Sequence, residues 1–77
     1  MVEYKECRDK AKVAFDISQN KEIDNIMRRK SCFDSIYALN EASTFNKELN
    51  TVYGMTAMLY KTLASLVDDE KEGPIEE

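Results

Sequence analysis

Residues 44–69, TFNKELNTVYGMTAMLYKTLASLVDD, carry the most regular hydrophobic pattern in this 77-residue chain. Apolar side chains recur there in alternating steps of four and three, the heptad spacing of a helix that packs along another helix. The positions of this seam are Phe45, Leu49, Val52, Thr56, Leu59, Leu63 and Leu66. Further large side chains widen the seam or lie opposite to it: Tyr53, Tyr60, Val67, Met55 and Met58. The segment is therefore predicted to be one long helix that is buried on several sides.

Two further segments show helical periodicity, and nowhere do apolar and polar residues alternate as they would in a strand. Residues 3–17 carry a narrow stripe of mostly small side chains: Tyr4, Cys7, Ala11, Ala14 and Phe15. Residues 21–39 carry a wider stripe: Ile23, Ile26, Met27, Phe33, Ile36 and Tyr37. Asn20 is the expected N-cap of the second helix, because its side chain can accept a hydrogen bond from a free backbone N–H group.

The chain is thus predicted to be all-α: a three-helix hairpin or bundle, oligomeric through the long third helix. Its helices are expected at about residues 3–17, 21–39 and 44–69. They form a single helical domain over residues 1–69, followed by an acidic tail, residues 70–77, that we expect to be disordered. Between the second and third helices, residues 40–44 contain no Gly or Pro, so a turn is favoured and a kinked continuation is the alternative.

The third segment is longer than the first can cover. At about 1.5 Å per residue, residues 44–69 make a helix of roughly 39 Å and residues 3–17 one of only about 23 Å. Leu63, Leu66 and Val67 are then expected to stay exposed in a single chain, and exposed apolar strips of this kind mark interfaces. We predict a homo-oligomer, most simply a dimer, with a monomer whose tail folds back as the alternative. The expected interface residues are Val52, Met55, Met58, Leu59, Leu63 and Leu66.

Gly54 lies in the middle of this predicted helix. Glycine there costs about 1 kcal/mol relative to alanine. Close packing against another helix, or a slight kink, would offset the cost, and the approach of a ligand is the other interpretation. A crossing point between two copies would suit this position.

The composition argues against catalysis and against a bound metal. The chain has no His and only two Cys, too few to supply the ligands of a tetrahedral zinc site. There is no imidazole base, no glycine-rich phosphate loop, and no Cys with a neighbouring base and orienting group. We therefore expect no enzyme activity, no cofactor and no metal.

The N-terminal sequence MVEYKECRDK is charged where a signal peptide would have its apolar core. Two cysteines are also too few for the disulfide framework of a small secreted protein. A cytoplasmic location, which is reducing, is therefore expected. Lys61 interrupts the most apolar segment, so no membrane span is expected either.

The role of the two cysteines depends on how the first two helices pair. If these helices form an antiparallel hairpin that turns near residues 19–20, Cys7 and Cys32 lie level with each other. A disulfide between them would join the two helices if their Cα atoms came within bonding reach. Free cysteine is also a good small core residue, and a reducing location favours this second interpretation.

Three consecutive basic residues interrupt the apolar pattern of residues 21–39. They cannot share one helical face, because successive residues are about 100° apart. The same hairpin register, however, brings basic side chains of the first helix opposite them, so that two basic rows flank one groove. The candidate phosphate- or carboxylate-binding residues are Arg28, Arg29, Lys30, Arg8 and Lys12, with Tyr4 and Tyr37 as stacking faces.

These basic residues also have an ordinary interpretation, which we favour. Glu6, Asp9, Asp24 and Asp34 are interspersed among them, so ion pairs within the helices would account for most of the charges on a solvated face. The formal net charge of -4 and the lack of a recognition-helix or zinc-finger pattern argue against duplex nucleic acid as a partner.

The segment ALNEASTFNKEL, residues 38–49, has the pattern Leu-x-Glu-Ala-x-x-aromatic. It resembles a segment of small phage helical-hairpin proteins that sequester cyclic oligonucleotide defence signals. The resemblance covers only these residues, and Phe45 stands where a Trp is common in that family. It implies an oligomeric sponge that holds nucleotide phosphates with basic residues and bases with aromatic ones, but it does not extend to ligand-contacting positions.

The sequence as a whole predicts a small binding protein. The leading hypothesis is an inhibitor or adaptor, of phage or mobile-element type, that docks on a protein partner through the surplus apolar surface of residues 44–69. Methionine suits such adaptable interfaces. The alternative is an oligomeric sponge that sequesters a small anionic ligand, such as a cyclic nucleotide, at the basic groove.

Overall fold

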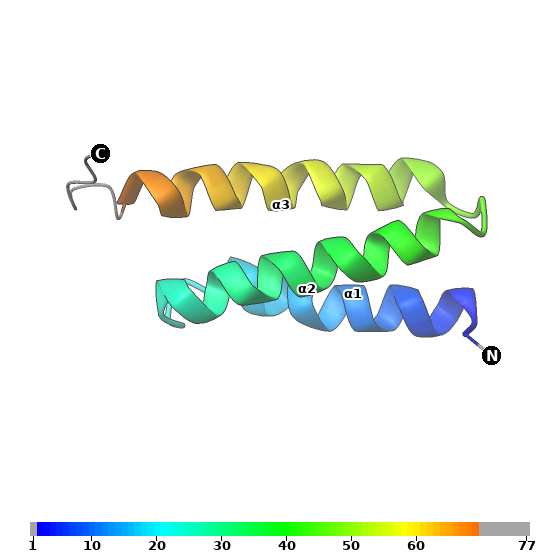
Figure 1. Ribbon diagram of the computed structural model, residues 1–77, viewed down its shortest axis with the longest axis horizontal. Helices are drawn as coiled ribbons and strands as arrows, with labels where there is room; N and C mark the ends of the chain where they lie inside the picture. The colour runs from blue at the N-terminus through cyan, green and yellow to red at the C-terminus, as the bar shows by residue number, and fades with distance from the viewer. Residues whose placement is uncertain (1, 70–77) are drawn as a thin grey trace, which may run out of the picture.

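The computed structural model describes residues 2–69 of the chain. Within that range it contains three helices and no strand: α1 (Tyr4–Gln19), α2 (Asn25–Ser43) and α3 (Leu49–Asp69). In Figure 1 consecutive helices run antiparallel, and α2 packs against both of the others. The predicted all-α architecture of three helices is confirmed, whereas the predicted tail, residues 70–77, lies outside the described residues. None of the three helices combines the length and the apolar character that crossing a bilayer requires.

The start of α2 differs from the prediction. Asp24 is the N-cap, and its carboxylate accepts a hydrogen bond from the backbone N–H of Met27 at 2.9 Å. The prediction that Asn20 caps this helix is wrong, because the Asn20 side chain accepts a hydrogen bond from the backbone N–H of Glu22, also at 2.9 Å. That bond stabilises a turn between the helices, so α2 begins later than the predicted residue 21.

A turn separates α2 from α3, but it lies later than predicted. α2 continues through the residues expected to form the turn, and residues 44–48 make the connection instead. Asn46 and Glu48 have left-handed backbone conformations, with φ of 58° and 51°. Asparagine tolerates this conformation better than most residues, and glutamate rarely adopts it. α3 therefore begins at Leu49.

The predicted register between α1 and α2 is wrong. The Ser35 hydroxyl donates a hydrogen bond to the Ala11 carbonyl oxygen at 2.8 Å. The predicted register would instead have placed Ser35 opposite Tyr4. Nε of Arg28 donates a hydrogen bond to the Ser18 carbonyl oxygen at 2.9 Å. The predicted register would have placed Arg28 opposite Ala11. The displacement is about two helical turns. It arises because the connecting turn is longer, and lies later in the chain, than assumed.

Cys7 and Cys32 consequently do not lie level with each other, contrary to the prediction. Both are buried and both are free thiols. Burial raises the pKa of the Cys7 thiol, and the neighbouring carboxylate of Glu41 raises it further. Burial also raises the pKa of the Cys32 thiol, while Ser18 and Arg28 act in the opposite direction. The two cysteines therefore belong to different neighbourhoods of the α1–α2 interface.

The core combines mostly small residues of α1 and α2, with Ile36 and Leu39 as the large exceptions, and large residues of α3. The buried residues of α1 and α2 are Cys7, Ala11, Ser18, Ser31, Cys32, Ser35, Ile36, Ala38, Leu39 and Ala42. α3 contributes Val52, Leu59 and Leu66, which are 2%, 0% and 1% exposed. Small side chains let α1 and α2 approach closely, and the aliphatic side chains of α3 fill the space along the pair.

The expectation that Leu66 stays exposed in a single chain is wrong, and Leu63 is partly buried as well. α3 packs mainly on α2, which runs antiparallel to it, so α2 and not α1 provides most of the cover that α3 has. The last residue of α1 also contacts α3, because Nε2 of Gln19 donates a hydrogen bond to Oγ1 of Thr62 at 2.9 Å. Val67 does remain exposed, as expected.

Candidate binding surfaces

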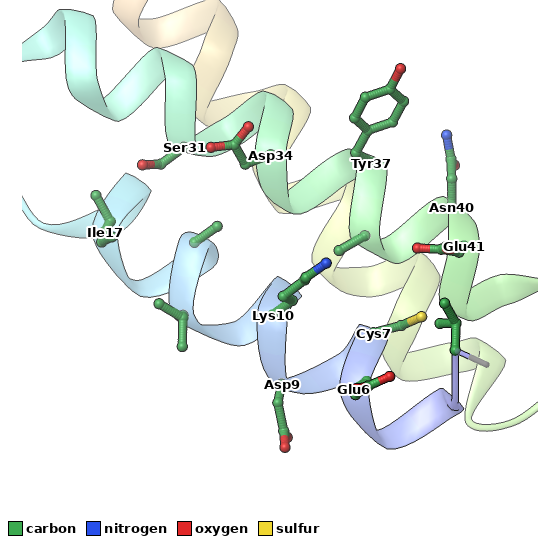
Figure 2. Close-up of a pocket in the computed structure, with 14 residues that line it drawn as sticks. Glu6, Cys7, Asp9, Lys10, Ile17, Ser31, Asp34, Tyr37, Asn40 and Glu41 are labelled. Atoms are coloured by element: carbon green, nitrogen blue, oxygen red, sulfur yellow. The ribbon is translucent and has the colours of Figure 1, made fainter.

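An open groove of about 1370 Å³ runs between α1 and α2 (Figure 2). All of its lining residues come from these two helices and from Val2, just before α1, so it lies on the side that α3 does not cover. Three nearly buried side chains, Cys7, Ser31 and Ala38, lie at its base. Because they are small, an occupant can approach the helix backbones closely.

Exposed apolar side chains form part of both walls of the groove. Val13 of α1 is 62% exposed, and Tyr37 of α2 is 78% exposed. Ile17 lies one helical turn beyond Val13 and is partly buried. Apolar side chains that form a contiguous exposed patch, unlike single exposed ones, mark contact sites.

Carboxylates outnumber amines around this groove. Its charged lining residues are Glu6, Asp9, Asp34, Glu41 and Lys10. Asp9 and Asp34 each form an ion pair with a lysine four residues away on the same helix, at 3.1 and 3.2 Å. In Figure 2, Lys10 extends from α1 toward α2, and the carboxylate of Glu41 lies on the opposite wall above Cys7. With Asp9 and Asp34 paired in this way, the acidic character of the groove comes from Glu6 and Glu41 against Lys10, and it favours a cationic occupant over a phosphate.

The five predicted anion-binding residues do not line this groove. Three of them are engaged elsewhere along the helices: Arg28 with the Ser18 carbonyl, Lys30 with Asp34 at 3.2 Å, and Lys12 with Asp16 at 3.3 Å. Arg29 is partly buried and also has a partner. The groove between two basic rows was a consequence of the predicted register, and it is lost with that register. Ion pairs within a helix, the favoured interpretation, occur at both lysines.

The fifth residue, Arg8, belongs to a cluster at the other end of α1. Its guanidinium lies 3.6 Å from the Glu48 carboxylate and 5.8 Å from the centre of the Tyr4 ring. The Tyr4 hydroxyl donates a hydrogen bond to Glu48, and its ring packs edge-on against Phe45 with the centroids 6.0 Å apart. Hydrogen bonding to Glu48 raises the pKa of Tyr4, and the same bond lowers the pKa of Glu48.

The two predicted stacking residues lie in different places. Tyr4 is engaged in the cluster with Phe45 and Glu48, which leaves its ring partly buried. Tyr37 lines the acidic groove and extends away from the α1–α2 pair in Figure 2. They therefore do not flank one common site.

α3 has an outward surface that its neighbours leave uncovered, which we call the outer face. Its residues are all exposed: Tyr53, Gly54, Ala57, Tyr60, Lys61, Ala64 and Val67. The three large side chains among them are 57% or 58% exposed. Five of these residues alternate in steps of four and three, which makes a second heptad seam beside the buried one. This second seam consists of Tyr53, Ala57, Tyr60, Ala64 and Val67.

The predicted interface residues divide between the core and the surface. Val52, Leu59 and Leu66 are buried within the chain, so they are not available to a partner. Met55 and Leu63 are partly buried against the core, and Met58 is 46% exposed. The predicted interface thus consisted largely of residues of the buried seam. The signal that would have separated the two seams was the alternation of tyrosine and alanine on one of them.

Gly54 has no packing role within the described chain. A Cβ atom added there would meet nothing within 4 Å. The close approach that would offset the cost of a helical glycine is therefore not made by α1 or α2. The groove residues Glu6, Lys10 and Glu41 were also missed as a site from sequence, because their proximity depends on the register of α1 against α2.

Among residues 2–69 no three potential metal ligands come together. Comparisons with models of known protein families, with curated proteins and with solved structures found no match to this chain. The functional assignment accordingly rests on two surfaces, the outer face of α3 and the acidic groove.

Proposed function

We propose that this protein is a small, cytoplasmic, non-enzymatic binding protein of the inhibitor or adaptor type, and that it works as a dimer joined through the outer face of α3. The observation that carries the proposal is the second seam, a heptad pattern exposed on a helix whose first seam is already buried. Residues 49–67 contain a single charge, at Lys61. An uncharged heptad seam on a helix surface is the pattern of a helix that packs on another helix.

The second seam is complementary to a second copy of itself. Large and small residues alternate along it, so an antiparallel copy shifted into register places each tyrosine of one helix over an alanine of the other. In that register Tyr53 lies across from Ala64 of the second copy, and Ala57 lies across from Tyr60. Packing of large side chains into the spaces above small ones is the basis of close helix pairing.

Charge also favours self-association at this face. The other surfaces of residues 2–67 mix acidic and basic side chains, so most other contacts between two copies would remove charged groups from water at a cost. The outer face has no acidic residue, and the long side chain of Lys61 can extend its amine into solvent from the edge of a helix pair. Gly54 lies seven residues before Lys61 and so shares that edge.

The test compares two tyrosines that are both exposed in the single chain. Tyr60→Glu places a charge in the second seam and should convert a dimer to a monomer, as measured by light scattering or native mass spectrometry. Tyr37→Glu, the same substitution on α2, should leave the dimer intact. A wild-type chain that stays monomeric at high micromolar concentration, or equal effects of the two tyrosine variants, would contradict the proposal.

A further inference from the structure

We infer that the acidic groove between α1 and α2 is a docking site for a basic amphipathic helix of another protein. This site does not involve the outer face of α3, so it does not depend on dimer formation. It also reverses the sign of the charge expected from the sequence, which predicted a basic groove for an anionic ligand.

The length and the base of the groove fit a helix. From Glu6 to Ile17, α1 forms its wall over roughly 17 Å, the length of about three helical turns. At the base lie Cys7, Ser31 and Ala38, whose small side chains permit the close spacing of packed helices. A helix bound there would pack on α1 and α2 from the side opposite to α3.

The walls of the groove combine apolar and acidic side chains, so they fit a helix that is apolar on one face and basic on its flank. Val13 and Ile17 offer apolar contacts to the inward face of the helix, and Tyr37 rises from the rim of the α2 wall. The carboxylate of Glu41 lies on the α2 wall above Cys7 in Figure 2, and it raises the pKa of that thiol at the groove base. A lysine or arginine on the flank of the docked helix would pair with this carboxylate, and the net negative charge of the chain would attract such a helix at long range.

Charge excludes the other candidate occupants. Asp9 and Asp34 already pair with lysines of their own helices, and a phosphate or nucleotide would also meet the carboxylates of Glu6 and Glu41 against the single amine of Lys10. The sequence that follows α3, EKEGPIEE, is itself acidic and would be repelled. Peptide grooves that accept one amphipathic helix, by contrast, commonly combine an apolar base with charges opposite to those of the helix.

The probe for this site is a synthetic amphipathic peptide of leucine and lysine, about fourteen residues long and fluorescently labelled, with its leucine–glutamate counterpart as the control. Fluorescence anisotropy should detect binding of the lysine peptide and not of the glutamate peptide. Glu41→Lys should weaken binding about tenfold at low salt, and the effect should shrink as salt screens the charges. Glu22→Lys, an equal change of net charge at an exposed turn residue, is the matched control and should have little effect.

A second pair of variants distinguishes this site from the outer face of α3. Val13→Ser should weaken peptide binding, whereas Val67→Ser, at a similarly exposed valine, should not. The peptide should also bind the Tyr60→Glu variant as it binds the wild type, whatever the oligomeric state. The inference would be overturned if Glu41→Lys and Glu22→Lys reduced the affinity for the lysine peptide equally. It would also be overturned if only Val67→Ser reduced that affinity, or if the lysine and glutamate peptides bound equally well. Circular dichroism confirms that each variant keeps its helix content.

Discussion

The α1–α2 pair is held together by small side chains and hydroxyl groups, whereas α3 is held to that pair by large aliphatic ones. Between α1 and α2, Ser35 donates to a backbone carbonyl of the facing helix, and buried alanines and cysteines surround it. On α3, Val52, Leu59 and Leu66 recur at seven-residue spacing and are almost fully buried. The first interface depends on close approach and specific hydrogen bonds, and the second on buried apolar volume.

This difference determines what each region leaves for partners. The small residues of the α1–α2 interface leave a groove above them, because their side chains do not fill the space between the helices. α3 uses one of its two heptad seams for the core, so the other is exposed. The groove is bordered by charges, and the outer face of α3 has only Lys61. One chain therefore presents two surfaces of opposite chemical character.

The largest effect should come from removing apolar volume on α3. Leu59→Ala replaces a side chain that is 0% exposed, and should lower the free energy of unfolding by about 2–5 kcal/mol. Chemical denaturation monitored by circular dichroism measures this change. Leu63→Ala, at a partly buried position on the same helix, should cost less. Equal costs at the two positions would contradict the expectation that the depth of burial sets what each leucine of this seam contributes to stability.

A smaller loss is expected from a hydroxyl between α1 and α2. Ser35→Ala removes the bond to the Ala11 carbonyl oxygen and should destabilise the fold by about 1 kcal/mol. Ser43→Ala is the control, because the Ser43 hydroxyl bonds only within its own helix, to the Asn40 carbonyl oxygen at 2.7 Å. If both substitutions cost the same in thermal or urea unfolding, the hydroxyl between the helices adds nothing specific to their pairing.

The smallest effect concerns the polar contact that connects α1 to the start of α3. The pKa of Glu48 is lowered in the folded chain, so its contribution to stability is present above the ordinary value of 4.5 and is lost as pH falls through the lowered pKa. The pKa of Tyr4 is raised, so its contribution is lost on the alkaline side, as pH rises through that raised value.

Glu48→Gln should therefore reduce stability at neutral pH slightly and flatten the acid limb of the stability–pH profile. Unfolding curves recorded between pH 3 and 7 measure this change. The contact is exposed to solvent, so its size should be that of a surface interaction. Glu22→Gln, at an exposed turn residue, is the control and should leave the acid limb as it is in the wild type. An unchanged acid limb in Glu48→Gln would show that the contact with Tyr4 does not stabilise the fold.

The helices could be predicted from the sequence because each is encoded by local spacing. The periodic positions of Val52, Leu59 and Leu66 identify α3 without knowledge of any other element. Helix ends were less certain, because Asn20 and Asp24 are both competent caps and only the length of the turn decides between them. Likewise, no Gly or Pro marks the turn at residues 44–48, where Asn46 and Glu48 adopt left-handed conformations.

The candidate sites were harder to predict because they depend on how the helices pair. A shift of about two turns in the α1–α2 register separates Cys7 from Cys32 and replaces a basic groove by an acidic one. Tyr53, Tyr60 and Val67 of the exposed seam were predicted only to widen the other seam, while the predicted interface included Val52, Leu59 and Leu66, which are buried. Both seams have the same spacing. Which seam faces the core depends on where α2 lies, and spacing within one helix does not contain that information.

The placement of the acidic groove determines how many partners a pair of copies can hold. No residue that lines the groove comes from α3, so in the proposed pair, joined along α3, each copy keeps its own groove open. Two basic helices, on one partner or on two, could then bind one pair of copies, and a partner that carries both on a linker of matching length would gain avidity. The proposed dimer would therefore be bivalent.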